Sequence, residues 1–126
     1  MDFIMKDIGF YTHFPYGKLD IAGDEEYGFR PYQLMVSSIA VCSGGVLRNV
    51  LEKMRLEIED IHIHADVKRI EEEANRLEKI HLHFQIKGLH LEEKKIEKAL
   101  QLAQKNCPMV QSVKGSIIIE ESFELI

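Results

Sequence analysis

The two cysteines of this 126-residue chain, Cys42 and Cys107, are the residues best suited to covalent chemistry. A thiolate is a strong nucleophile, and two thiols that come together can be oxidised to a disulfide and reduced again. The two residues lie far apart in the sequence, and a permanent structural bridge is not expected in a reducing compartment. Any disulfide between them is therefore expected to be transient and part of a reaction.

Cys107 is followed by Pro108, a residue suited to the first position of a helix because its missing amide proton would be unpaired there anyway. A short helix that starts at Pro108 would make Cys107 its N-cap. The unpaired amide protons and the helix dipole would then favour the thiolate, so this pattern predicts a lowered pKa for the Cys107 thiol. The alternative is a chance Asn-Cys-Pro turn without chemical meaning.

Cys42 lies in a run of small residues that extends from Ser37 to Gly45. Each glycine inside a helix costs roughly 1 kcal/mol relative to alanine. The adjacent glycines Gly44 and Gly45 therefore predict the close approach of another backbone, from the same chain or from a second subunit. Burial would raise the pKa of Cys42 unless an Arg or Lys lies nearby. An inert, buried thiol on a small-residue packing face is the alternative interpretation.

The segment that carries Cys42 has the pattern of a helix. Apolar residues recur at helical spacing from Tyr32 to Met54, which predicts one long and mostly buried helix that starts near Pro31. Before this helix, glycines and prolines interrupt residues 3–23 and indicate a strand-rich segment. Cys42 is thus expected near the middle of the long helix.

The second half of the chain changes to a strand pattern. Two runs of alternating apolar and polar residues, 61–67 and 80–86, flank a charged stretch from Glu71 to Asn75, and they predict an antiparallel hairpin. Residues 91–105 place apolar side chains among lysines and glutamates, as an amphipathic helix does. A final strand is expected near the end of the chain.

Length and composition restrict the class of protein. At 126 residues, with 45% hydrophobic and 29% charged residues, the chain is expected to form a single domain that covers residues 1–126. A net charge of -5 argues against a nucleic-acid partner, since such binding depends on lysines and arginines. The sequence shows neither the pattern of a secretory signal nor an apolar run of membrane-spanning length, so we expect a cytoplasmic protein with no membrane partner.

Four histidines could form a metal site. His62 and His64 share one strand face, His81 and His83 share another, and the hairpin would set the two pairs opposite each other. Neutral imidazoles bind Zn²⁺ and Ni²⁺. The alternative is that all four are polar positions of a sheet whose other face forms the core.

The cysteine segments resemble those of a known family. The run Pro31-Tyr32-Gln33-Leu34, followed by Cys42 in an Ala-Val-Cys-Ser context, is similar to the Pro-Glu-Gln-Leu and Ala-Ala-Cys segments of the OsmC/organic hydroperoxide resistance family. Ala103 to Pro108 is similar to the Ala-x-x-x-Cys-Pro segment of that family. The resemblance implies an α+β fold: antiparallel sheets packed on two long central helices of an intertwined homodimer, with an active site at each end of the subunit interface.

The resemblance also implies a reaction. In peroxidase members of the family, the first cysteine attacks an organic hydroperoxide and becomes a sulfenic acid, and the second condenses with it to a disulfide. Carried over, Cys42 is peroxidatic and Cys107 resolving. A thiol or dithiol reductant, such as a lipoylated protein, restores the pair, and no metal or other cofactor is needed.

Two positions depart from the family pattern. Tyr32 stands where the family has a glutamate that orients an arginine, and no arginine precedes Arg30 in the segment that normally supplies the arginine that activates the thiolate. Arg30 is the candidate replacement, with Lys18 as a second possibility. Tyr27, Phe29 and Tyr32 are candidates for an apolar substrate pocket.

Two other functions fit the same residues. A protein of this fold that lacks efficient turnover could sense redox state or bind a small hydrophobic ligand. Alternatively, the cysteines could be a purely structural buried pair in a protein that functions elsewhere on its surface.

Overall fold

The first part of the chain, Met1–Ser37, is a small sheet followed by the start of a helix. The computed structural model describes residues 1–126. Strands β1 (Ile4–Met5), β2 (Phe10–Phe14) and β3 (Gly17–Ile21) pair in the order β1-β2-β3, all antiparallel. The predicted strand-rich start is therefore confirmed.

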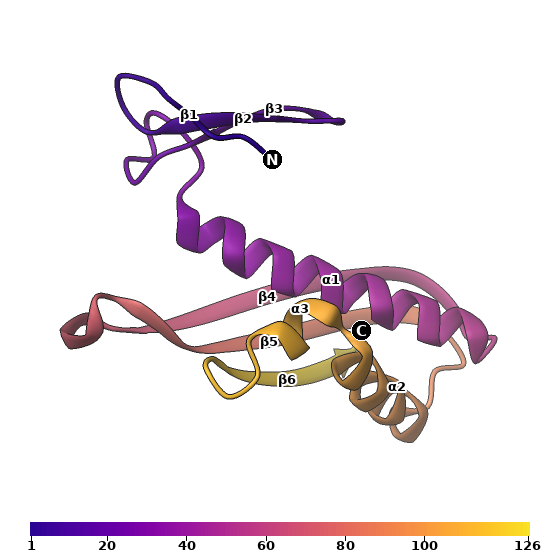
Figure 1. The fold of residues 1–126 in the computed structure, drawn as a ribbon. Helices are drawn as coiled ribbons and strands as arrows, with labels where there is room; N and C mark the ends of the chain where they lie inside the picture. Colours follow the sequence, from indigo (N-terminus) through magenta and orange to yellow (C-terminus); the bar gives the residue numbers. More distant parts are fainter. The chain divides into compact units, whose positions relative to one another are not determined.

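The second part, Ser38–Ile126, contains most of the secondary structure (Figure 1). Helix α1 enters it from the first part. The elements are α1 (Pro31–Lys53), β4 (Glu57–Ile70), a short 3₁₀ turn η1 (Glu71–Glu73), β5 (Arg76–Leu89), α2 (Glu93–Asn106), α3 (Pro108–Ser112) and β6 (Ile118–Leu125). The α+β class is thus confirmed, and the helix limits lie within two residues of those expected.

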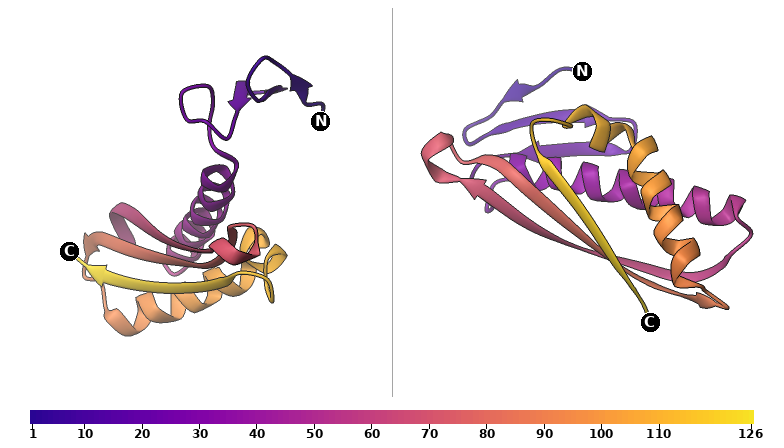
Figure 2. Two further views of the ribbon diagram at one scale, coloured as in Figure 1. Left: turned by 90° about the vertical axis from the view of Figure 1, so that its left-hand side faces the viewer. Right: turned by 90° about the horizontal axis from the view of Figure 1, so that it is seen from below.

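Strands β4 and β5 form the predicted antiparallel hairpin, with Ile63 opposite Phe84 and His64 opposite His83. Both views in Figure 2 show this long hairpin with β6 beside β5. The pairing of β5 with β6 is parallel, so the expectation of antiparallel sheets is wrong for this pair of strands. The reason is the connection: the chain crosses over through α2 and α3 before it forms β6, as parallel neighbours require.

One face of this second sheet is the core. Alternate residues of β5 are buried, namely Ile80, Leu82, Phe84 and Ile86. Helix α2 adds Ile96, Ala99, Leu100 and Ala103, which are also buried. The intervening residues of β5 are polar and partly exposed, as a sheet with a single covered face requires.

Helix α1 packs on that face along one side only. Its buried residues from Ser38 onward are Ile39, Ser43, Gly44, Leu47 and Leu51. Val41 is 70% exposed, so the prediction of a mostly buried helix is wrong for a single chain. Spacing identified a helix, but the buried side runs through Ser43 and Gly44 rather than through Val41.

The two adjacent glycines of α1 meet different surroundings. A Cβ added to Gly44 would lie 2.5 Å from Cδ1 of Ile63 on β4, so this glycine lets α1 approach the sheet. A Cβ added to Gly45 would meet nothing within 4 Å. The sequence predicted the close approach of another backbone to these glycines. Gly44 instead lies against the side chain of Ile63, and no atom of the same chain lies close to Gly45.

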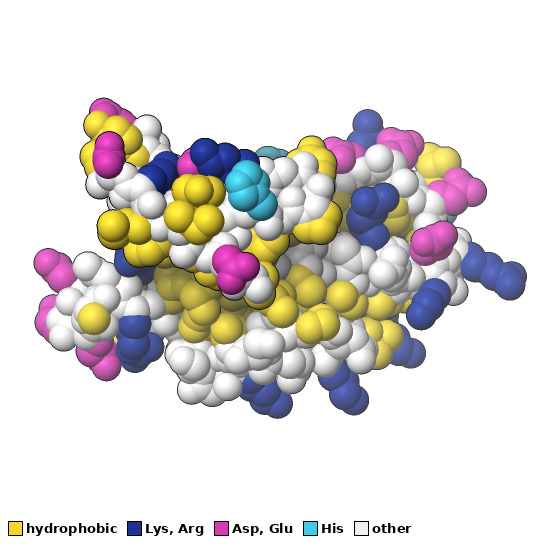
Figure 3. Space-filling model, turned by 45° about the horizontal axis from the view of Figure 1, so that its top comes forward, with side chains coloured by type: hydrophobic (Ala, Val, Ile, Leu, Met, Phe, Trp, Pro, Cys, Tyr) yellow, Lys and Arg dark blue, Asp and Glu magenta, His cyan; other side chains and the backbone are white.

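By length and composition alone, α1 is apolar enough to cross a membrane, contrary to the expectation from the sequence. The central helix of a globular domain passes the same test. Leu47 and Leu51 pack into the core, and 39% of the apolar stretch of α1 is buried. Figure 3 shows hydrophobic side chains among charged ones on the face that it draws.

We predict that Gly88→Ala destabilises the second sheet by about 1 to 3 kcal/mol, as overpacking does. A Cβ at this position would overlap the backbone carbonyl oxygen of Glu57 on the neighbouring strand, which cannot move aside as a side chain can. Urea unfolding would measure the change. Gly17→Ala is the matched control, since nothing lies within 4 Å of its added Cβ. Equal stabilities for the two variants would contradict the prediction.

Candidate active site

The fold brings the two cysteines together. Cys42 lies on α1 and is half-buried, whereas Cys107 lies at the junction of α2 and α3 and is fully buried. The two side chains are close enough for Cys42 to raise the pKa of the Cys107 thiol, and both thiols are free. Residues that are distant in the sequence thus form a dithiol within the second part of the chain.

Cys107 occupies the predicted N-cap position, with Pro108 as the first residue of α3. Its side chain makes no regular capping hydrogen bond. The backbone amides of Val110 and Met109 nevertheless lie close enough to favour the thiolate.

The predicted lowering of the Cys107 pKa is wrong, because burial outweighs these amides and raises the pKa of the thiol. The adjacent Cys42 raises the pKa further, since two neighbouring thiols disfavour a second negative charge. At neutral pH Cys107 is therefore held as a thiol, which must lose its proton when it reacts.

A half-buried carboxyl that binds the residue after Cys42 was not predicted. Ser43, the residue after Cys42, is fully buried and donates a hydrogen bond of 2.7 Å to Oε1 of Glu121 on β6. Burial raises the pKa of Glu121, while the hydrogen bond from Ser43 partly opposes this. The sequence contains a signal that could have identified it: Glu121 interrupts the apolar alternation of Ile119 and Phe123.

The remaining predicted site residues lie in the first part of the chain. The guanidinium carbon of Arg30 lies 4.8 Å from the ring centroid of Tyr32, which is a cation–π contact. Lys18 lies 3.7 Å from Asp20 and 4.8 Å from the Tyr11 ring centroid. Their catalytic roles stay predictions.

The three candidate pocket residues are only partly covered. Tyr27 is 46% and Phe29 60% exposed, and Tyr32 is half-buried. Three pockets of the second part of the chain do not contain them. The apolar substrate pocket stays a prediction.

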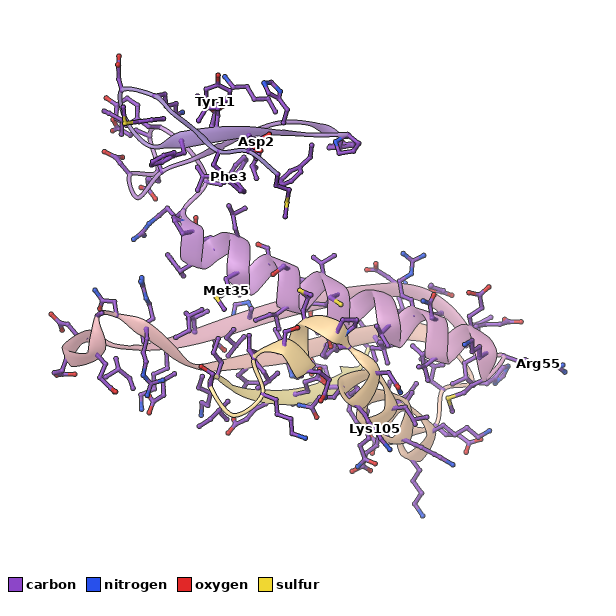
Figure 4. The ribbon with its side chains drawn as sticks, in the orientation of Figure 1. Asp2, Phe3, Tyr11, Met35, Arg55 and Lys105 are labelled. Carbon is purple, nitrogen blue, oxygen red and sulfur yellow. The ribbon has the colours of Figure 1, made fainter.

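One pocket lies beside the C-terminal half of α1. It has a volume of about 920 Å³ between the C-terminal half of α1 and the start of β4, and its lining includes Arg48 and Arg55 but neither cysteine. Arg55 follows the end of α1 (Figure 4) with a left-handed φ of 59°. A second pocket, of about 330 Å³, includes Glu121.

The predicted cluster of four imidazoles does not form, and no group of three or more His, Cys, Asp or Glu side chains is arranged to hold a metal ion. His81 and His83 instead share the hydroxyl of Ser122, at 2.7 and 2.8 Å. His64 lies 3.3 Å from Asp66. These histidines occupy the polar face of the sheet, as the alternative interpretation proposed.

Comparisons with known proteins agree with the fold. Among solved structures, the chain is similar to a hypothetical protein from Aquifex aeolicus VF5, with 28% identity, a TM-score of 0.87, and coverage of 99% of this chain and 93% of that one. It is similar to an organic hydroperoxide resistance protein OsmC, described as a predicted redox protein and regulator of sulfide bond formation, from Legionella pneumophila, with 20% identity, a TM-score of 0.76, and coverage of 98% and 97%. The organic hydroperoxide resistance protein OhrB of Bacillus subtilis has 20% identity, a TM-score of 0.66, and coverage of 95% and 93%.

No curated protein sequence matches the chain. The family model described as OsmC-like protein, however, matches residues 23–122, which is well over half of the chain and includes both cysteines. This protein therefore belongs to the OsmC-like protein family.

Proposed function

We propose that this protein has a stress-related redox function and, more specifically, that it is a thiol-dependent peroxidase that reduces organic hydroperoxides through Cys42 and Cys107. The observation that carries the proposal is the closeness of two free thiols, since Cys42 raises the pKa of Cys107. A purely structural pair would not need one partner to be half-exposed, as Cys42 is.

The chemistry assigns different roles to the two cysteines. Cys42, as thiolate, attacks the distal peroxide oxygen; the O–O bond breaks, an S–O bond forms, and the alkoxide takes up a proton and leaves as an alcohol. The thiol of Cys107 then attacks the resulting sulfenic acid, which forms the disulfide and releases water. Accessibility favours Cys42 for the encounter with peroxide, and burial suits Cys107 to an intramolecular step.

The disulfide must be reduced before the next turnover. A dithiol reductant attacks it, forms a mixed disulfide with one cysteine, and then closes to its own cyclic disulfide, which returns two electrons and two protons to the cysteines. We propose a thiol or dithiol of the cytoplasm in this role, with a lipoylated protein as one candidate. The cycle uses only thiols and peroxide, and we propose no metal or other cofactor.

The names of similar proteins support this direction. Two of the solved structures above are described as organic hydroperoxide resistance proteins, and one of these also as a predicted redox protein. Their identity to this chain is 20%. They therefore support thiol peroxidase chemistry as a proposal, and the organic hydroperoxide substrate has to be tested.

A non-catalytic redox sensor or binding protein for a small hydrophobic ligand is the second candidate. The raised pKa of Cys107 favours it, since a resolving thiol that resists ionisation would prolong the life of an oxidised Cys42. Steady-state turnover separates the two functions.

We predict that the unaltered protein consumes cumene hydroperoxide with dithiothreitol or a dihydrolipoylated protein as reductant. Cys42→Ser should abolish turnover, because it removes the nucleophile. Cys107→Ser should retain one rapid reaction per chain and lose the dihydrolipoyl-dependent cycle, because no internal disulfide can form. Stopped-flow and steady-state assays measure both steps. Turnover that survives Cys42→Ser, in folded protein, would exclude the proposed mechanism.

We further propose that Arg30 assists the thiolate and that the Tyr32 ring orients it. Arg30→Ala should slow the reaction of Cys42 by about tenfold, because it removes the cation proposed to favour the thiolate. Tyr32→Leu should give a smaller loss, and Tyr32→Phe, which keeps the aromatic ring, should retain most activity. A double Arg30→Ala, Tyr32→Leu variant should be no slower than Arg30→Ala. Strictly additive losses would contradict the coupling.

We also propose a homodimer that covers the exposed side of α1, where Val41 and Gly45 lie one turn apart. Val41→Lys should convert the dimer to a monomer in size-exclusion chromatography with light scattering, because it places a charge in an apolar contact. Leu102→Lys on α2, at a 39% exposed position, is the control and should leave the dimer intact. A dimer that withstands Val41→Lys would place the interface elsewhere.

A further inference from the structure

A further pocket, of about 320 Å³, lies where α2, α3 and β6 meet. Helix α2 contributes Gln101, Gln104 and Lys105, and the rest of the lining comes from α3, the turn after it and the start of β6. Small-molecule sites in proteins have volumes of roughly 300 to 1,000 Å³, so this pocket suits a small ligand. It lies within the second part of the chain, and neither cysteine lines it.

Two lysines and no acidic residue line this pocket. Lys105 of α2 (Figure 4) and Lys114, which follows α3, are exposed, and neither forms an ion pair. The whole chain has 21 acidic and 16 basic residues, so a pocket without a carboxylate runs against its composition. The two pockets described above do contain acidic residues, such as Glu52 and Glu97. The charge of this third pocket therefore favours an anionic ligand.

The floor of the same pocket is apolar. Val110 of α3 and Ile117 are buried, and Ile119 of β6 is half-buried. A small inorganic anion would gain nothing from these side chains, whereas a hydrocarbon chain lying on them would be removed from water. An apolar floor with unpaired cations at the exposed rim thus fits an anion that also has an apolar part.

Two glutamine side chains at the pocket are held in place by the fold. Nε2 of Gln104 donates a hydrogen bond of 3.0 Å to the backbone carbonyl of Ile119, and Nε2 of Gln111 donates one of 3.2 Å to the backbone carbonyl of Gln104. These bonds join α2 to β6 and α3 to α2. A ligand loses less free energy to the ordering of side chains when the walls of its site are already fixed.

We infer that this pocket binds a small amphipathic carboxylate. Its hydrocarbon chain lies on Val110, Ile117 and Ile119, and its two carboxylate oxygens accept charge-assisted hydrogen bonds from Lys105 and Lys114. Octanoate is a probe of this chemical class. The site goes beyond the proposed peroxidase function, since neither thiol takes part in binding.

The location of the pocket gives its ligand an effect on Cys107. This residue lies between α2 and α3, and both helices line the pocket. Because the Cys107 thiol is fully buried, an alkylating reagent reaches it only when the junction of the two helices opens locally. A ligand that binds the closed junction and not the opened one favours the closed form by mass action. The bound carboxylate therefore protects Cys107 from alkylation.

The first test is a titration with octanoate, followed by proton–nitrogen NMR. The backbone amide of Gly115 and the side-chain amides of Gln104 and Gln111 should shift and reach saturation. Lys114→Gln should weaken binding about threefold, and the double Lys105→Gln, Lys114→Gln variant about tenfold, as the loss of exposed charge contacts does.

The control variant is Lys53→Gln, which changes a lysine at the end of α1 outside the lining of the pocket and should bind octanoate as the unaltered protein does. Acetate and octanol each lack one half of the ligand, so both should bind more weakly than octanoate. Shifts that map outside the pocket, or equal affinities of the double variant and the unaltered protein, would overturn the inference. Octanol that binds as tightly as octanoate would overturn it as well, because the lysines would then contribute nothing.

The second test uses Cys42→Ser protein, in which Cys107 is the only thiol. With octanoate at about ten times its Kd, alkylation of Cys107 by iodoacetamide should slow about elevenfold, and in the double lysine variant at the same octanoate concentration about twofold. An unchanged rate under saturating octanoate would overturn the placement of the ligand across α2 and α3. Neither test uses peroxide, so both succeed or fail independently of peroxidase turnover.

Discussion

The packing of α1 on the single apolar face of the second sheet is the constraint on which the candidate site depends. Leu47 and Leu51 fix the depth of the helix, and Gly44 allows it to approach Ile63 of β4. This approach brings Ser43 to Glu121 and Cys42 to Cys107. A helix held further from the sheet by larger side chains would separate both pairs, and the dithiol would not form.

The crossover after the hairpin supplies the other half of the site. Because β6 is parallel to β5, the chain has to pass over the sheet through α2 and α3, and Cys107 lies at the break between these helices. Pro108 is the first residue of α3, a position to which proline is suited. The local sequence therefore accounts for the break between the two helices. The position of Cys107 in the core follows from the buried apolar stripe of α2, which ends at Ala103.

Local patterns in the sequence predicted much of the fold. Strict alternation identified the β4–β5 hairpin, and Pro31 and Pro108 marked two helix starts, because these signals depend on neighbouring residues only. The parallel pairing of β6, the buried side of α1 and the raised pKa of Cys107 could not be predicted in this way. Each depends on what packs against the residue in three dimensions, and no spacing of Val41 or Cys107 along the chain carries that information.

The candidate site shows the same division. Cys42 and Cys107 were recognised from residue type and from their resemblance to the family, whereas the Ser43–Glu121 pair depends on a contact between residues far apart in the sequence. Glu121 visibly interrupts the apolar alternation of β6 in the sequence. Its hydrogen bond with Ser43, however, could not be predicted without knowing where α1 packs. Buried polar residues that break an apolar pattern are therefore useful guides to sites of this kind.

The central claim is that Cys42 and Cys107 form one redox-active dithiol. Its most direct test is to treat the reduced protein with one equivalent of cumene hydroperoxide and to examine tryptic peptides by mass spectrometry under non-reducing conditions. The account predicts a single disulfide that joins Cys42 and Cys107 and that dithiothreitol reverses. Protein that stays fully reduced, or Cys42 that is oxidised to sulfinic acid without a disulfide to Cys107, would contradict it.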